Sequence, residues 1–165
     1  FSNEEIQKLV NHTLKCMSKE SLDEQVQKYG SMEKYKEYLV SGFENEQAAA
    51  DLLKWYGSKE KAMTAVMQST GNTEEIKKEQ AEHAKIYKQF MAAKEADNMD
   101  MAHSAVKMLV ENYKAMFALD NARNILLDLA KEYLQREKLA EVTDRQYGKG
   151  CSEYIAHAIQ HYYGV

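Results

Sequence analysis

The chain has 165 residues, of which 44% are hydrophobic, and it carries a formal net charge of -4 at pH 7. This length and composition suffice for one compact domain with a shared hydrophobic core. The acidic balance excludes nucleic acid as a direct partner, because phosphate binding needs clustered Lys and Arg side chains.

The sequence has no proline and only seven glycines, which favours an all-α fold because these two residues interrupt helices most often. No apolar run approaches the roughly 20 residues needed to cross a bilayer. Residues 1–7 also lack the basic and apolar zones of a signal peptide. We therefore expect a cytoplasmic protein without membrane contact.

Helix start and stop signals divide the chain into nine predicted helices. Ser2 and Glu5 form a capping box at the first start, and Ser21 is the predicted cap of the second helix. Three glycines end helical patterns and are each followed by a new cap, in the pairs Gly30 with Ser31, Gly57 with Ser58 and Gly71 with Asn72. The predicted helices cover residues 3–18, 21–29, 32–40, 44–56, 59–69, 73–96, 100–118, 121–137 and 149–163.

Residues 29–34 and 56–61 repeat one pattern at a spacing of 27 residues. Their sequences are Tyr-Gly-Ser-Met-Glu-Lys and Tyr-Gly-Ser-Lys-Glu-Lys. Each copy therefore has a helix end, a Gly stop, a Ser cap and a new helix start. The pattern predicts a duplicated helix-turn-helix unit at about 21–70.

Two groups of polar side chains have spacings found in metal sites. Glu153, His157 and His161 are spaced four residues apart and share one stripe of the last predicted helix. Asp100 and His103 have the carboxylate-x-x-His spacing of half a di-iron site, which needs a second such pair that the sequence lacks. Polar groups opposite an apolar helix face are most often a solvated surface, so we expect no metal and no cofactor.

Motifs of catalysis are missing from the sequence. There is no Gly-x-Ser-x-Gly nucleophile elbow, and the Gly-Lys-Gly at 148–150 lacks the spacing of a phosphate-binding loop. Cys16 and Cys151 are too few and too far apart for a disulfide framework, and we expect both to be buried thiols. The chain is therefore predicted not to be an enzyme.

Aromatic and methionine side chains are frequent: there are eleven Tyr, nine Met, four Phe and one Trp. Such side chains suit a promiscuous binding pocket, because Met repacks at small cost and Tyr offers both a ring and a hydroxyl. The alternative is ordinary core packing, since unbranched Met fills irregular gaps in any bundle. Composition alone leaves both explanations open.

Three segments together resemble the TipAS family, the antibiotic-recognition domains that follow a helix-turn-helix in MerR-type transcriptional regulators. Residues 24–35 resemble the family's N-terminal turn and Tyr-bearing helix, with Tyr29 where Trp is usual. Residues 132–139 resemble its Tyr-containing helix end. Residues 148–159 resemble its closing Gly-rich turn and helix, which is the most specific of the three resemblances.

The resemblance implies a single TipAS-like effector-binding domain over residues 1–165, with a compact, globin-like fold of orthogonally packed helices. It implies a cleft for large, mostly apolar antibiotics, either hydrophobic small molecules or peptides, and contact with DNA only through a separate N-terminal domain that this chain lacks. The family prototype captures its antibiotic through a cysteine whose matching place is near Asp128, so the expected binding here is non-covalent. Aromatic density and the resemblance together predict ligand contacts at Tyr87, Phe90, Met108, Tyr113, Phe117, Tyr133 and Tyr154.

A second hypothesis is a helical interaction or dimerisation module without a small-molecule ligand. It rests on the apolar stripe of the first predicted helix, which is formed by Ile6, Leu9, Leu14 and Met17. An exposed stripe of this kind would pair with a partner protein or with a second copy of the chain as a homodimer.

Overall fold

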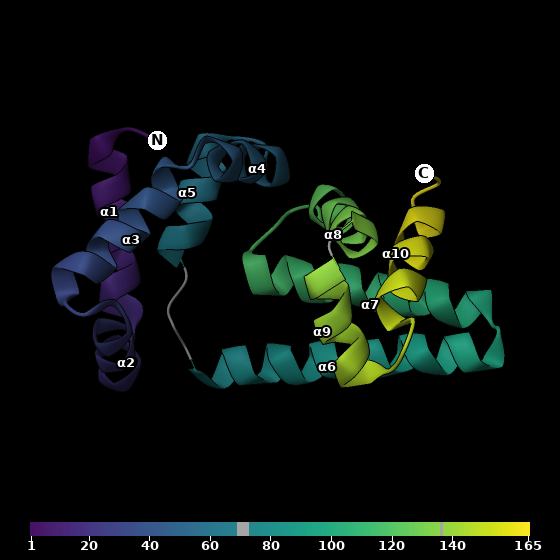
Figure 1. Ribbon diagram of the computed structural model, residues 1–165. Helices are drawn as coiled ribbons and strands as arrows, with labels where there is room; N and C mark the ends of the chain where they lie inside the picture. The colour runs from purple at the N-terminus through teal and green to yellow at the C-terminus, as the bar shows by residue number, and fades with distance from the viewer. Residues whose placement is uncertain (69–72, 136) are drawn as a thin grey trace. The chain divides into compact units, whose positions relative to one another are not determined.

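The computed structural model describes residues 1–68, 73–135 and 137–165, and every regular element in them is an α-helix (Figure 1). This confirms the predicted all-α class. The chain divides into two compact units, Phe1–Thr73 and Glu74–Val165, and each is described by itself. The N-terminal unit holds α1 (Asn3–Cys16), α2 (Lys19–Tyr29), α3 (Met32–Glu44), α4 (Glu46–Tyr56) and α5 (Lys59–Gln68). The C-terminal unit is built from α6 (Thr73–Ala96), α7 (Met99–Phe117), α8 (Arg123–Gln135), α9 (Glu137–Tyr147) and α10 (Cys151–Tyr162).

The two predicted Gly-Ser turns have the expected local chemistry. Gly30 and Gly57 close α2 and α4 at φ values of 96° and 86°, in the left-handed region that side chains disfavour. The Ser31 and Ser58 hydroxyls then accept hydrogen bonds from backbone amides in the first turns of α3 and α5, each at 3.1 Å. Both copies of the predicted repeat therefore adopt the same helix-turn-helix form.

Other helix starts differ from the prediction or cannot be compared with it. Ser21 is not the cap of α2, because the Ser18 hydroxyl accepts from the Ser21 amide at 3.2 Å and the helix begins at Lys19. The stop expected at Gly71 and the cap expected at Asn72 lie outside the described residues.

The core of the N-terminal unit forms where α1 packs against α3 and α5. Its buried apolar side chains are Ile6, Leu9, Val10, Tyr35 and Ala62. Two members of the α1 stripe, Ile6 and Leu9, are thus 3% and 0% exposed, and the other two, Leu14 and Met17, are half-buried. The stripe is packed inside this unit, so it is not the exposed face on which the hypothesis of an interaction module rests.

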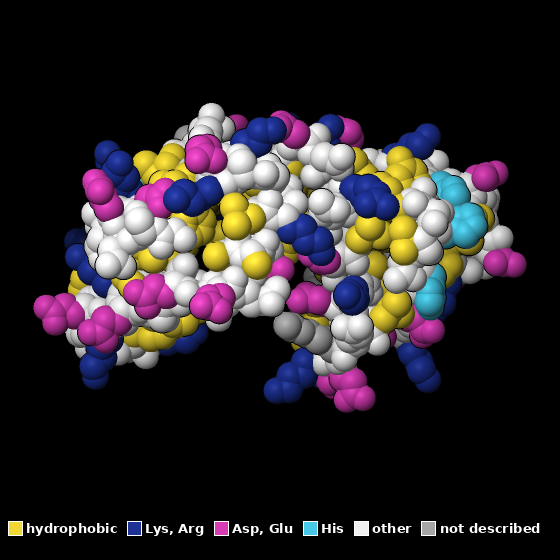
Figure 2. Space-filling view, turned by 90° about the horizontal axis from the view of Figure 1, so that it is seen from above, with side chains coloured by type: hydrophobic (Ala, Val, Ile, Leu, Met, Phe, Trp, Pro, Cys, Tyr) yellow, Lys and Arg dark blue, Asp and Glu magenta, His cyan; other side chains and the backbone are white. Residues whose placement is uncertain are grey.

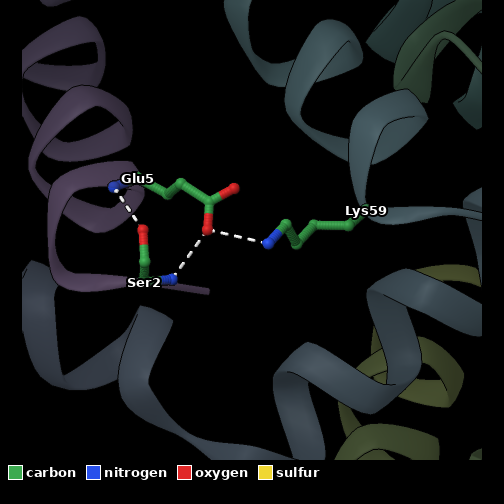
Figure 3. A network of polar contacts seen from close by, with 3 residues as sticks. All are labelled: Ser2, Glu5 and Lys59. Atoms are coloured by element: carbon green, nitrogen blue, oxygen red, sulfur yellow. Dashed lines mark hydrogen bonds and ion pairs between the residues drawn. The ribbon is translucent and has the colours of Figure 1, made fainter.

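A polar network joins the starts of α1 and α5 (Figure 3). The Glu5 amide donates to the Ser2 hydroxyl at 3.1 Å, and the Ser2 amide donates to Glu5 Oε1 at 2.8 Å, which confirms the predicted capping box. Lys59 Nζ lies 2.8 Å from the same carboxylate oxygen. Lys59 and the Ser2 amide lower the pKa of the Glu5 carboxyl to about 2.

In the C-terminal unit, α10 packs against α7, α8 and α9 (Figure 1). The largest side chains in this core are less than 2% exposed: Ile86, Tyr87, Phe90, Val106, Leu109, Leu126, Cys151, Ile155 and Ile159. Burying an aliphatic or aromatic side chain of this size contributes about 1.5–3 kcal/mol. Side chains of α6, α7, α8 and α10 therefore form one shared core, to which α9 adds the buried Thr143.

The sequence prediction missed α9. The helix does have an apolar face at helical spacing, formed by the half-buried Leu139, Ala140 and Tyr147 around its only fully buried residue, Thr143, and the prediction did not use this pattern. The exposed face of α9 is supported by an ion pair one turn apart, Arg145 Nη2 to Glu141 Oε1 at 3.0 Å. The helix predicted over 121–137 is correspondingly shorter, because α8 ends at Gln135.

Candidate ligand-binding cavity

Three hydroxyl groups from three helices form a buried chain in the C-terminal unit. Tyr87 Oη of α6 lies 2.7 Å from Tyr133 Oη of α8, and Thr143 Oγ1 of α9 donates to Tyr133 Oη at 3.3 Å. All three residues are less than 9% exposed. Each hydroxyl therefore satisfies the hydrogen bonding of another in a site that water reaches poorly.

The hydroxyl chain borders a partly open cavity of about 380 Å³ that is lined by residues of α6, α7, α8 and α9. We call it the tyrosine cavity, and its lining residues are Gln80, His83, Ala84, Tyr87, Met116, Tyr133, Thr143, Gln146 and Tyr147. None of these is Asp, Glu, Lys or Arg. The lining combines aromatic rings with amide and hydroxyl groups, which is the usual composition of a small-molecule site.

The Tyr87 ring stands at the centre of the aromatic wall. Its centroid lies 4.2 Å from that of His83, 5.1 Å from that of Tyr147 and 6.2 Å from that of Phe90. The wall continues to Tyr113, whose ring is 6.3 Å from His83. Residues from α6, α7 and α9 thus build one continuous aromatic surface beside the cavity.

Burial keeps the titratable groups of this site uncharged at neutral pH. It raises the pKa values of the Tyr87, Tyr133 and Tyr147 hydroxyls above their ordinary value of 10.0. It lowers the pKa of His83 below its ordinary value of 6.5, so the imidazole is neutral at pH 7. The tyrosine cavity therefore offers hydrogen bonds and ring faces but no counter-charge.

Contacts at and beside the turn after α9 join this helix to α6 and α10. Gly148 has a φ of 131°, and a Cβ on it would stand 2.9 Å from the Met91 methyl of α6. In the same turn, Lys94 Nζ of α6 donates to the Lys149 carbonyl at 2.8 Å. The carboxylate of Asp144 accepts from the Ser152 amide at 2.8 Å and joins α9 to α10. These contacts fix α9, and with it the positions of Thr143 and Tyr147.

A second hollow, of about 780 Å³, lies between α6 and α7, and we call it the α6–α7 groove. Its lining residues are Glu75, Lys78, Glu79, Glu82, Lys107, Met108, Glu111, Asn112 and Ala115. Asn112 Nδ2 donates to the Glu79 carbonyl at 3.2 Å. In contrast to the tyrosine cavity, most of this lining is charged.

The structure brings some of the seven predicted ligand-binding residues together and separates others. Tyr87 and Tyr133 line the tyrosine cavity, and the buried Phe90 and Tyr113 support it from behind. The remaining three residues lie elsewhere: Met108 lines the α6–α7 groove, Phe117 is 40% exposed beside Tyr113, and Tyr154 is half-buried and lines neither hollow.

Seven lining residues were not predicted: Gln80, His83, Ala84, Met116, Thr143, Gln146 and Tyr147. A signal for His83 exists, because His83, Tyr87 and Phe90 recur at helical spacing on one face of α6. The three α9 residues could not be assigned to a site while that helix was missing from the prediction.

Neither a metal cluster nor a membrane span is found in the part of the chain that the structure describes. Within residues 1–68, 73–135 and 137–165, no three His, Cys, Asp or Glu side chains are grouped to hold an ion. Of the polar stripe on α10, His157 Nε2 lies 3.7 Å from Glu153 Oε1. Among the same residues, no helix is long and apolar enough to cross a membrane.

A family model for the TipAS antibiotic-recognition domain matches residues 49–162, more than half of the chain. The match includes the resembling segments 132–139 and 148–159 and every residue of the tyrosine cavity, whereas the segment 24–35 precedes it. No curated protein and no solved structure matches the chain. The chain therefore belongs to the TipAS antibiotic-recognition family, whose members bind antibiotics as ligands and are not catalysts.

Proposed function

We propose that this protein senses a large, mostly apolar antibiotic by binding part of it non-covalently in the tyrosine cavity. The observation that supports this most is the uncharged, aromatic lining around the Tyr87–Tyr133 hydroxyl pair, inside the region that matches the family. A volume of about 380 Å³ is at the lower end of the range for ligand pockets. A large antibiotic would therefore insert one ring-bearing part, with the rest outside.

The lining restricts the chemistry of the inserted part. An ion that entered this site would lose its hydration without gaining a counter-charge, which costs several kcal/mol. Amide groups and aromatic rings are accepted instead, because the Gln80 and Gln146 side chains each offer one donor and one acceptor group and Tyr147 offers a ring. Neutral, amide-rich or polyaromatic antibiotics are the ligand class that fits best.

The burial of Cys151 supports non-covalent binding. Cys151 is fully buried and does not line the cavity, and burial together with Asp144 raises the pKa of its thiol to about 11. The one cysteine of the C-terminal unit, Cys151, therefore presents no thiolate to a ligand in the tyrosine cavity, and release should be complete on dilution.

In the cell, this recognition would control transcription. We propose that residues 1–165 act as one effector-binding domain of a cytoplasmic MerR-type regulator, whose separate N-terminal domain contacts DNA. The antibiotic would bind one arrangement of a homodimer more tightly than the other and so favour that arrangement. The favoured arrangement would then change the geometry of the bound DNA.

Filling the cavity tests the proposal. Ala84 lines the tyrosine cavity on α6, so Ala84→Leu should occupy part of its volume and weaken antibiotic binding at least tenfold, about 1.4 kcal/mol. Ala92→Leu, at an exposed position of the same helix, is the matched control and should bind as the unmodified chain does. Calorimetric titration with a panel of neutral cyclic peptide and polyaromatic antibiotics measures both. Equal affinities of the two variants for a bound antibiotic would contradict the proposed site.

A further inference from the structure

Two histidines far apart in the sequence meet on the surface of the C-terminal unit. His103 of α7 and His161 of α10 have their Nε2 and Nδ1 atoms 2.8 Å apart, with ring centroids separated by 4.9 Å. Both side chains remain accessible to solvent. Figure 2 shows histidine side chains in contact on the surface. In the sequence, His103 has the metal-site spacing with Asp100, and His161 has it with His157. The fold brings one histidine from each of these two groups into contact.

The contact brings together the atoms that bind metals. A neutral imidazole presents one N–H and one lone pair, and the lone-pair nitrogen is the commonest metal ligand in proteins. Two nitrogens bound to one tetrahedral zinc ion at the usual bond length stand about 3.3 Å apart. His103 and His161 need to separate by only a fraction of an ångström to admit an ion, which side-chain rotation supplies without moving either helix.

The surroundings of the pair suit an ion held at the surface. The Tyr162 ring packs edge-on against the His103 ring, with centroids 5.9 Å apart, and limits its rotation. Asp100 and His157 lie one helical turn before His103 and His161 respectively, on the same helix faces. No third ligand stands in place among the described residues, so water would fill the other positions around the ion.

We propose that His103 and His161 bind one divalent transition-metal ion of the zinc class and that this ion links α7 to α10. Imidazole nitrogens select zinc, nickel and copper over magnesium and calcium, which prefer oxygen ligands. The site is separate from the tyrosine cavity, since neither histidine lines it. An ion that binds only the folded chain also stabilises it.

The proposal is tested by titrating the chain with Zn²⁺ by calorimetry, with Mg²⁺ as the control ion. One Zn²⁺ should bind per chain, and His103→Gln and His161→Gln should each weaken binding about tenfold or more. At a free Zn²⁺ concentration of 100 times Kd, the thermal midpoint should rise by about 5–10 °C. Ring-nitrogen chemical shifts of labelled histidine should change at His103 Nε2 and His161 Nδ1.

His12→Gln tests a competing pair of donor atoms, because His12 Nε2 also lies near Cys16 Sγ, at 3.4 Å. His12→Gln should leave the Zn²⁺ affinity unchanged. Loss of affinity in His12→Gln but not in His103→Gln would overturn the proposal. The absence of saturable Zn²⁺ binding up to about 1 mM would overturn it as well.

Discussion

Replacing Tyr133 by Phe keeps the aromatic ring and removes only its hydroxyl, which is the central one of the three buried hydroxyl groups. The lost group bonds Tyr87 Oη at 2.7 Å and accepts from Thr143 Oγ1 at 3.3 Å. Each net hydrogen bond contributes about 1 kcal/mol, and the partners left behind are buried, which adds to the cost. We expect Tyr133→Phe to lower the free energy of unfolding by about 2–3 kcal/mol.

Urea unfolding followed by circular dichroism measures this loss, and the thermal midpoint should fall by about 4–12 °C for a chain of this length. A double-mutant cycle with Tyr87→Phe isolates the shared bond. Because the double variant removes both partners, its effect should be smaller than the sum of the single effects by about 1 kcal/mol. Tyr38→Phe, at a position 54% exposed, is the control and should be nearly neutral.

Two results would refute this reasoning about the cavity. One is a Tyr133→Phe variant whose stability is unchanged within about 0.3 kcal/mol, since additive error is of that size. The other is strict additivity with Tyr87→Phe. Either would mean that the two hydroxyls are not a coupled buried pair, and the proposed donors and acceptors of the site would have to be reassigned.

Three other predictions follow from single positions. Gly148→Ala should destabilise the chain by about 2 kcal/mol, because its φ of 131° is strained for any residue with a side chain. Gly42→Ala in α3, with open space around it, should instead stabilise the chain by about 0.5–1 kcal/mol, and equal urea midpoints of the two variants would contradict this reasoning. The folded-state pKa of Glu5 is depressed from 4.5 to about 2, so its contribution is present above pH 4.5 and is lost as the pH falls toward 2. Glu5→Gln should therefore flatten the acid side of the stability curve, and added salt should reduce the difference because Lys59 is accessible. The folded state keeps His83 neutral, so stability should decline as the pH falls through 6.5; a His83→Gln variant with the same slope there would rule out this residue as the cause.

Structural features could be predicted from the sequence where their cause lies within a few adjacent residues. The turns at Gly30 and Gly57 were predictable because a left-handed glycine followed by a Ser cap involves only a few adjacent residues. α9 was not predicted, although it has an apolar face at helical spacing; what its sequence does not give is that Thr143 meets Tyr133 of another helix. Long-range polar contacts of this kind have no counterpart in a one-dimensional pattern.

The same distinction explains the candidate site. Tyr87 and Tyr133 could be proposed from aromatic density, and both line the tyrosine cavity. Met108 and Phe117 share the broad apolar surface of α7 in the sequence, but periodicity does not say which neighbour each part of so wide a surface meets. Met108 contacts the α6–α7 groove, and Phe117, the last residue of its helix, is largely exposed.

The central claim is that an antibiotic enters the tyrosine cavity, and backbone and side-chain NMR of the full chain during titration tests it most directly. With a neutral antibiotic of the class that fits, saturable shift changes should be largest at Tyr87, Tyr133, Thr143 and Tyr147 and should be reversed by dilution. Shift changes confined to the charged α6–α7 groove or to the N-terminal unit would contradict the claim, as would the absence of binding across the whole panel.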